Sequence, residues 1–160
     1  METPKMRPAT IIAVTSDDPR HDAVRRRAAA IARDAQSRVI LWARDAAVSV
    51  LESPLPTAWS GDGEEEQFGD RLGPSDLMAA GREPLARQVG ELRKAGVDAW
   101  GWLPDTADAE HLTAYAEEHD ADLVLVSAED TDLLADVRDL DSHGAHGESP
   151  RRARVEAVPV

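Results

Sequence analysis

The stretch Ala121-Asp122-Leu123-Val124-Leu125-Val126-Ser127-Ala128-Glu129-Asp130 decides the fold of this chain. It is an apolar run of strand length that passes directly into a turn rich in carboxylates. Ligands of open α/β sheets lie beyond the carboxyl ends of the strands, so the turn after such a strand bears on function.

A strand, a helix and a second strand open the chain. Residues 10–14 are β-branched and apolar, and a helix follows them with Asp18 as its capping carboxylate and Pro19 in its first turn. This helix is predicted to continue to about Gln36, and residues 39–43 predict the second strand. A right-handed crossover makes the two strands parallel.

The later part of the chain repeats this alternation. It predicts a helix from Ser75 or Asp76 to Gly96 that Pro84 restarts, a strand at 97–103, a helix at 106–119 capped by Thr106, the strand at 121–127, a helix at 131–140 and a strand at 154–158. The pattern is that of a single α/β domain.

Two segments interrupt the alternation. Residues 45–74 form a long insertion rich in Pro, Gly and Glu, which either packs its own aromatics, such as Trp59, on the domain or forms a lid or partner surface. Residues 141–153 form a tail segment rich in Gly, His and Ser, of a composition typical of mobile loops.

Composition excludes several classes of protein. The 160 residues include no cysteine, so no disulfide framework is possible, and no apolar run reaches the length of a membrane helix or a signal peptide. The formal net charge of −13 disfavours nucleic-acid binding, and the adjacent Arg25, Arg26 and Arg27 point in different directions on a helix. We expect a soluble cytoplasmic protein that binds neither nucleic acid nor membrane.

The chain resembles the universal stress protein family over most of its length. The likeness lies in Ile11-Ile12-Ala13-Val14 with its alanine-rich helix, in Ala95-Gly96-Val97-Asp98, and in residues 116–126, where a helix leads into Ala-Asp-Leu-Val-Leu-Val. The resemblance implies an open five-stranded parallel sheet in the order 3-2-1-4-5 with helices on both faces, as in the adenine nucleotide alpha hydrolase-like folds. It also implies a homodimer.

The nucleotide motif of that family is missing here. Members that bind ATP follow this strand with Gly, two residues, Gly, nine residues, then Gly and Ser or Thr, because glycine lets the backbone approach the phosphates. The four positions here are Ser127, Asp130, Leu140 and Asp141. Asp17 and Asp18 are expected to approach the acidic turn, with Arg20 as the one obvious cation. ATP in the usual pose is therefore not expected, and no cofactor is predicted.

Several other groups of residues could bind a metal ion or form a catalytic site, or have only structural roles. The acids could hold Mg²⁺ or only cap helices and carry surface charge. A transition metal or a mobile tail would account for His143, His146 and Glu148. No triad is expected, because no Gly-x-Ser-x-Gly elbow is present and no base is evidently oriented toward a serine, among Ser16, Ser127, His21 and His111. A P-loop is also absent.

These observations predict a universal-stress-protein-like, non-enzymatic protein of the stress response. It would act by binding a protein partner or a small ligand and would not hold ATP in the usual mode. The alternative is a divergent small-ligand, nucleotide or Mg²⁺ site at the carboxyl ends of the first and fourth strands. The residues predicted to contact a ligand there are Thr15, Ser16, Asp17, Arg44 and Ser127.

Overall fold

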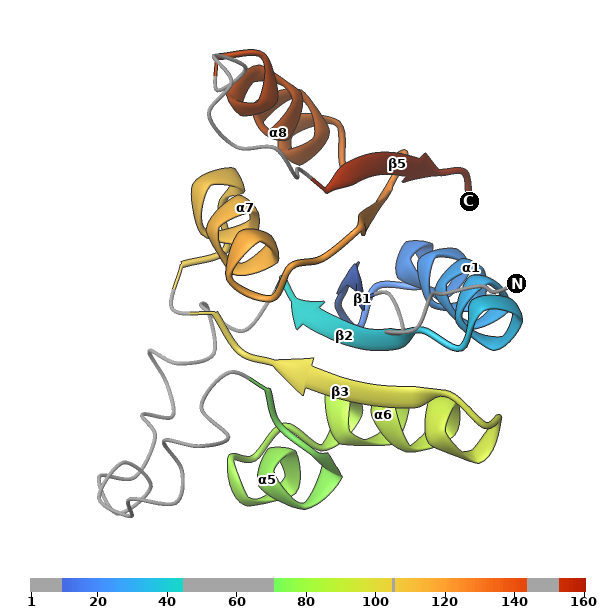
Figure 1. Cartoon of the computed structure of the whole chain (residues 1–160). Helices are drawn as coiled ribbons and strands as arrows, with labels where there is room; N and C mark the ends of the chain where they lie inside the picture. The colour runs from blue at the N-terminus through green and yellow to red at the C-terminus, as the bar shows by residue number, and fades with distance from the viewer. Residues whose placement is uncertain (1–9, 45–70, 105, 144–152) are drawn as a thin grey trace.

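The computed structural model describes residues 10–44, 71–104, 106–143 and 153–160. Strands and helices alternate along these ranges, as the sequence predicts (Figure 1). The strands are β1 (Thr10–Thr15), β2 (Arg38–Ala43), β3 (Asp98–Trp102), β4 (Leu123–Ser127) and β5 (Arg154–Val158). The helices are α1 (Arg20–Ala35), α5 (Pro74–Ala79), α6 (Glu83–Lys94), α7 (Ala109–Glu118) and α8 (Thr131–His143).

The strands form one five-stranded sheet in the order β3-β2-β1-β4-β5, and every pairing is parallel. Parallel strands need crossovers of helical length, which the alternating helices supply. The predicted fold class, strand order and parallel direction are therefore confirmed. In this order β1 lies between β2 and β4. The chain adds β2 and β3 on one side of β1 and then β4 and β5 on the other, so the strand order reverses between the neighbouring strands β1 and β4.

Each face of the sheet buries its own apolar cluster, because successive strand residues point to opposite faces. Helices α1, α5 and α6 cover one face of the sheet, and α7 and α8 cover the other (Figure 1). Alternate strand residues such as Ile11 and Leu41 belong to the first cluster, and their neighbours Ile12 and Trp42 belong to the second. All five of the β4 residues are buried. The apolar run at residues 123–127 is thus covered on both faces, as expected for an inner parallel strand.

Helix boundaries follow the sequence signals with one correction. The helix predicted from residue 75 is interrupted before Glu83, and Pro84 lies in the first turn of α6, as its fixed φ favours. Gly96 has a φ of 90°, the left-handed conformation that a glycine after a helix supplies. The predicted cap Thr106 is wrong, because Asp108 precedes α7 and accepts the backbone N–H of His111 at 2.9 Å.

This cap makes a pH-dependent prediction. Replacing Asp108 with alanine should lower the free energy of unfolding by about 1 kcal/mol at neutral pH. The His111 backbone N–H holds the pKa of Asp108 below its ordinary value of 3.8. A depressed pKa stabilises the fold above the unfolded pKa, and this contribution disappears as the pH falls through the folded pKa. Urea denaturation of both proteins should therefore differ at neutral pH and converge in strong acid.

Thr106→Ala is the matched control, because Thr106 is the cap that the sequence alone favoured. Its free energy of unfolding should change by less than about 0.5 kcal/mol at every pH. A loss for Thr106→Ala as large as that for Asp108→Ala would contradict the assignment of the cap.

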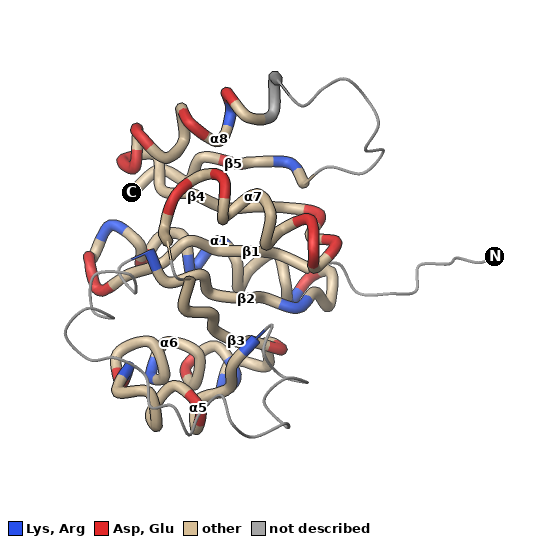
Figure 2. The backbone as a smooth tube through the Cα atoms, turned by 90° about the vertical axis from the view of Figure 1, so that its left-hand side faces the viewer, with Lys and Arg blue, Asp and Glu red and all other residues tan. Residues whose placement is uncertain are grey.

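Charge is unevenly distributed over the described elements. Acidic residues gather along α8 and around α7 (Figure 2). The prediction that the arginine triplet of α1 forms no single stripe is confirmed, since Arg25 donates to Thr15 and Arg27 donates to Glu156 of β5 at 2.7 Å.

In the described part of the chain no helix combines the length and the apolarity needed to span a membrane.

Candidate functional site

The candidate site lies where β1 and β4 end side by side. Ile11, Ile12 and Ala13 of β1 pair in register with residues 123–125 of β4, so the turns after the two strands meet. Open α/β sheets bind ligands at such a point, where the strand order reverses. The turn after β1 carries Ser16 and leads into α1, and the turn after β4 carries Asp130 and leads into α8.

Asp130 is buried at this point and is held by three side chains. Its side chain is only 1% exposed, and its Oδ1 lies 3.1 Å from the Arg20 guanidinium and 3.0 Å from that of Arg44. Its Oδ2 lies 2.7 Å from Nε2 of His21. A buried carboxylate needs such compensation, because desolvation penalises an unpaired charge. Asp130 is therefore not a solvent-exposed carboxylate, although it lies in the turn after β4.

The arginines are held in turn by the neighbouring backbone and carboxylates. The backbone N–H of Arg44 donates to the carbonyl of Thr15 at 2.8 Å, which fixes the end of β2 beside that of β1. Hydrogen bonds from Arg20 to Asp18 and Asp130 raise the pKa of the Arg20 guanidinium. The backbone N–H of Arg20 lowers the pKa of Asp18. Arg20 therefore remains cationic beside Asp130.

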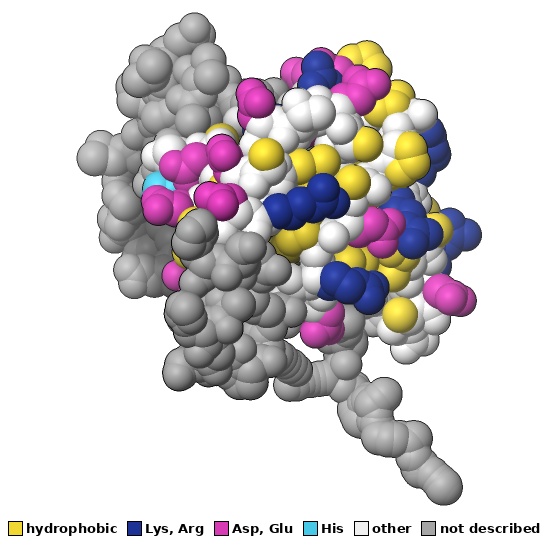
Figure 3. Space-filling view, turned by 90° about the horizontal axis from the view of Figure 1, so that it is seen from above, with side chains coloured by type: hydrophobic (Ala, Val, Ile, Leu, Met, Phe, Trp, Pro, Cys, Tyr) yellow, Lys and Arg dark blue, Asp and Glu magenta, His cyan; other side chains and the backbone are white. Residues whose placement is uncertain are grey.

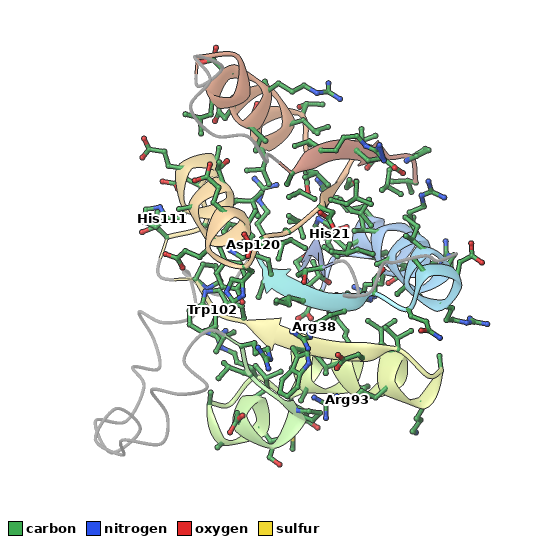
Figure 4. All side chains as sticks on the ribbon, viewed as in Figure 1. His21, Arg38, Arg93, Trp102, His111 and Asp120 are labelled. Atoms are coloured by element: carbon green, nitrogen blue, oxygen red, sulfur yellow. The ribbon has the colours of Figure 1, made fainter. Side chains whose placement is uncertain are left out.

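His21 connects Asp130 to Ser16. Its side chain is 3% exposed, and its Nδ1 lies 2.7 Å from the hydroxyl oxygen of Ser16. The same hydroxyl accepts the backbone N–H of Asp18 at 3.0 Å. Figure 4 shows His21 inside the molecule, whereas His111 lies at the outer side of α7. The prediction that no base is oriented toward a serine is wrong for Ser16, because His21 lies within hydrogen-bond distance of its hydroxyl. Sequence reasoning missed this contact because Asp130, the residue that orients His21, lies 109 positions away from it.

A cavity of about 220 Å³ opens beside Ser16. It lies between the carboxyl ends of β1 and β2 and the turn that joins α5 to α6. Its lining is part polar and part apolar, and consists of Thr15, Ser16, Asp17, Ala43, Gly81, Arg82, Pro84, Leu85, Gln88 and Leu103. A site with convergent polar groups on an apolar floor is the usual form of a small-ligand pocket.

Gln88 of α6 forms one wall of the cavity. The Thr15 hydroxyl donates to its Oε1 at 2.9 Å, and its Nε2 donates to the carbonyl of Ser16 at 3.1 Å. Arg25 in turn donates to the Thr15 hydroxyl at 2.8 Å, and burial lowers the pKa of its guanidinium. Gln88 also borders a second hollow, of about 310 Å³, between α1 and α6. The wall between the two hollows is thus a fixed hydrogen-bonded layer.

The structure separates the five residues predicted to contact a ligand. Thr15, Ser16 and Asp17 line the cavity, while Arg44 binds Asp130. Ser127 is fully buried, and its hydroxyl accepts the backbone N–H of Glu129 at 3.1 Å, so it stabilises the turn after β4.

Sequence reasoning missed His21, Gln88 and Arg82 as members of the site. A histidine in the first turn of a helix that follows a strand was the one available signal, because that turn lies at the ligand-binding end of the sheet. Gln88 and Arg82 come from the α5–α6 region, and no local pattern relates them to β1.

The described residues contain no cluster of side chains that would form either of the metal sites considered from the sequence. Within residues 10–44, 71–104, 106–143 and 153–160, no three His, Asp or Glu side chains are placed to hold a metal ion. The tail residues His146 and Glu148 lie outside the described residues, as do residues 45–70 of the insertion predicted at 45–74 and the side chain of His143.

Comparison with solved structures finds the same fold. A protein of the universal stress protein family from Burkholderia pseudomallei superposes with a TM-score of 0.61 at 15% identity, over 98% of this chain and 100% of that one. The universal stress protein from Archaeoglobus fulgidus in complex with dAMP gives a TM-score of 0.54 at 17% identity, over 94% and 98% of the two chains. No family sequence model and no curated protein matches the chain. At such identities the likeness establishes the fold.

Proposed function

We propose that this chain is a universal-stress-protein-like, non-enzymatic binding or regulatory protein of the cytoplasmic stress response, and that it does not hold ATP in the usual mode. The fold shared with universal stress protein structures supports the first part of the proposal. The buried carboxylate of Asp130, which binds Arg20, His21 and Arg44, supports the second part. This is the observation that carries the proposal.

Asp130 places a negative charge at the end of β4, where a bound phosphate would need hydrogen-bond donors. Its carboxylate takes up hydrogen bonds from Arg20, His21 and Arg44 at the end of β4. An incoming phosphate would have to displace this internal anion or lie against it, and like charges at 4 Å cost about 1 kcal/mol even in water. The cations at this point are therefore already committed to the protein's own carboxylate.

The backbone after β4 also differs from a phosphate-binding loop. Such loops need free N–H groups and glycines that allow close approach. Here Leu140 and Asp141, at two of the family's motif positions, lie within α8, where helical hydrogen bonds use the backbone N–H groups. Both features oppose a triphosphate without excluding a smaller ligand.

The cavity beside Ser16 favours a small polar ligand. Its volume of about 220 Å³ is below the usual range of pockets for drug-sized molecules. Asp17 and Arg82 both line it, so a molecule with hydroxyl or charged groups would find partners of either sign. A solved structure of similar fold is a complex with dAMP, so a mononucleotide is tested beside smaller polar molecules, which this volume fits better.

Thermal denaturation with ligands tests this proposal. ATP with Mg²⁺ should leave the melting temperature unchanged, whereas a ligand at one hundred times its dissociation constant would stabilise the protein by about 2.7 kcal/mol, or about 5–10 °C. AMP and small polar metabolites form the rest of the panel. A clear shift with ATP would contradict the proposal.

Two variants locate any ligand that does bind. Gln88→Ala removes the polar wall of the cavity and should abolish the shift, while Arg87→Ala, an exposed neighbour on α6, should keep it. A shift that survives Gln88→Ala would place the ligand elsewhere. If a mononucleotide responds and ATP does not, the alternative of a divergent nucleotide site is favoured.

A homodimer belongs to the same proposal. β5 pairs with β4 and ends the sheet, so its other edge offers unpaired backbone groups in the described structure. Viewed from the β5 side, apolar, basic and acidic side chains are interspersed on the described part of this face (Figure 3). Light scattering should report a dimer, and a strict monomer would contradict this part of the proposal.

A further inference from the structure

The geometry points to Ser16 as a reactive nucleophile that accepts an acyl group from a small ester or another activated acyl compound. Ser16, His21 and Asp130 form a continuous hydrogen-bonded chain, with 2.7 Å at each of its two contacts. The serine end of this chain opens on the cavity of about 220 Å³. The inference goes beyond the binding function proposed above and does not depend on it.

Asp130 selects the tautomer of His21 that a base requires. An ionised carboxylate only accepts hydrogen bonds, so Nε2 of His21 carries the proton that Asp130 receives. In the neutral imidazole Nδ1 is then an acceptor, and it faces the Ser16 hydroxyl, which donates to it. This is the arrangement of nucleophile, base and orienting carboxylate that activates a serine.

The carboxylate is fixed so that it cannot turn away from the histidine. Its Oδ1 is bound by Arg20 and Arg44, which leaves Oδ2 for His21. The two arginines come from different segments, one from α1 and one from the end of β2. Asp130 acts here through His21, so it is a positioning residue, while Ser16 and His21 face the acyl donor and the proton.

The surroundings of Ser16 favour negative charge on its oxygen. The backbone N–H of Asp18 donates to this oxygen at 3.0 Å, and the N-terminus of α1 begins four residues later. A backbone donor stabilises an anion, whereas the first N–H of α1, that of Arg20, is taken up by the Asp18 carboxylate at 2.9 Å. The Asp18 N–H therefore stabilises the negative charge that develops on the Ser16 oxygen as its proton leaves.

Access distinguishes Ser16 from the other serine at the strand ends. Ser127 is completely buried and its hydroxyl is engaged with Glu129, whereas Ser16 is half-buried and lines the cavity. A small acyl compound in the cavity therefore lies beside Ser16, whereas Ser127 does not line this cavity.

The step is an acyl transfer that balances without a further reagent. The Ser16 oxygen attacks the carbonyl carbon while its proton passes to Nδ1 of His21. The bond between the carbonyl carbon and the leaving oxygen breaks, and the leaving oxygen takes the proton from His21. The products are an ester on Ser16 and the free alcohol or phenol.

The test is incubation of the purified protein with p-nitrophenyl acetate. One equivalent of nitrophenol should be released, and mass spectrometry of peptides should find the acetyl group on Ser16. Ser16→Ala should abolish the release, and His21→Gln should slow it by about 100-fold. Ser75→Ala and His111→Gln remove exposed residues of the same types and should change nothing. An acetyl group on lysine alone, or a rate unchanged in His21→Gln, would overturn the inference.

A thiol variant keeps the test decisive if His21→Gln folds poorly. The chain has no cysteine, so Ser16→Cys supplies a single thiol. Activation by His21 should make it react with iodoacetamide at least about tenfold faster than the exposed thiol of Ser75→Cys. Asp130→Asn in the Ser16→Cys background should remove most of this advantage while the cavity stays accessible. Equal rates for the two thiols would overturn the inference.

The outcome separates this inference from the proposed function. Stoichiometric acylation with no response to ATP supports both. Repeated release of nitrophenol supports the nucleophile and overturns the non-enzymatic proposal, because it requires hydrolysis of the acyl group. Absence of any acylation overturns the nucleophile and leaves the ligand-binding tests unaffected.

Discussion

Replacing Asp130 with alanine is expected to lower the free energy of unfolding by about 2–4 kcal/mol. The substitution removes the acceptor of three side chains and leaves Arg20, His21 and Arg44 around an empty position. Breaking a buried charge pair costs about 3–5 kcal/mol when the remaining charge stays buried. The two arginine side chains are 36% and 34% exposed, so water can solvate them in part, and the expected loss is lower.

Urea denaturation followed by circular dichroism measures this effect. Asp136→Ala, on the exposed side of α8, removes the same charge and should change the free energy of unfolding by less than about 0.5 kcal/mol. Asp130→Asn should also destabilise, since an amide can accept from one donor but presents its own N–H groups to the others. An Asp130→Ala protein as stable as Asp136→Ala would contradict the buried network.

Replacing Trp42 with alanine is expected to cost about 3–5 kcal/mol. Trp42 is completely buried in the cluster that joins the sheet to α7 and α8, and it is among the largest fully buried side chains. Its indole nitrogen has no hydrogen-bond partner among the described residues, so packing is what the substitution removes. Trp42→Phe should accordingly recover most of the loss.

Trp100 is the matched control for Trp42. It lies on the edge strand β3, with the guanidinium groups of Arg71 and Arg93 each 4.7 Å from its ring centre. Contacts of this kind contribute about 0.5–1 kcal/mol at exposed sites, so Trp100→Ala should cost about 1–2 kcal/mol. Circular dichroism is the appropriate probe, because both substitutions alter tryptophan fluorescence. A larger loss for Trp100 than for Trp42 would contradict the burial of the two rings.

The local patterns of the sequence were sufficient for most of the fold. The last strand was predicted at the residues where β5 lies, and the restart of a helix at Pro84 is confirmed. Trp100 and Trp102, two positions apart on β3, share a face, and the ring of Trp102 stacks on Tyr115 of α7 at 5.4 Å. Such features depend on the period of a strand and on the fixed φ of proline, which neighbouring residues determine.

The cap of α7 shows where local patterns fail. Thr106 and Asp108 are both good capping residues, and the sequence alone favoured Thr106. The helix begins at Ala109 because Ala109 and Leu112 pack against the sheet, and that packing makes Asp108 the residue that receives the His111 N–H. Tertiary contact thus decided between two locally equivalent caps.

The sequence by itself determined the alternation of strands and helices, the apolar faces of each element and the absence of glycine from residues 127–141. Only the tertiary structure decided what the turn after β4 does. Asp130 looked like one of several exposed acids, yet it is buried on His21 and two arginines, and the chain continues to Ser16. The physical reason is that these hydrogen bonds depend on which strands are neighbours and on how two turns face each other. Residues 109 positions apart meet there, and no local period encodes that meeting.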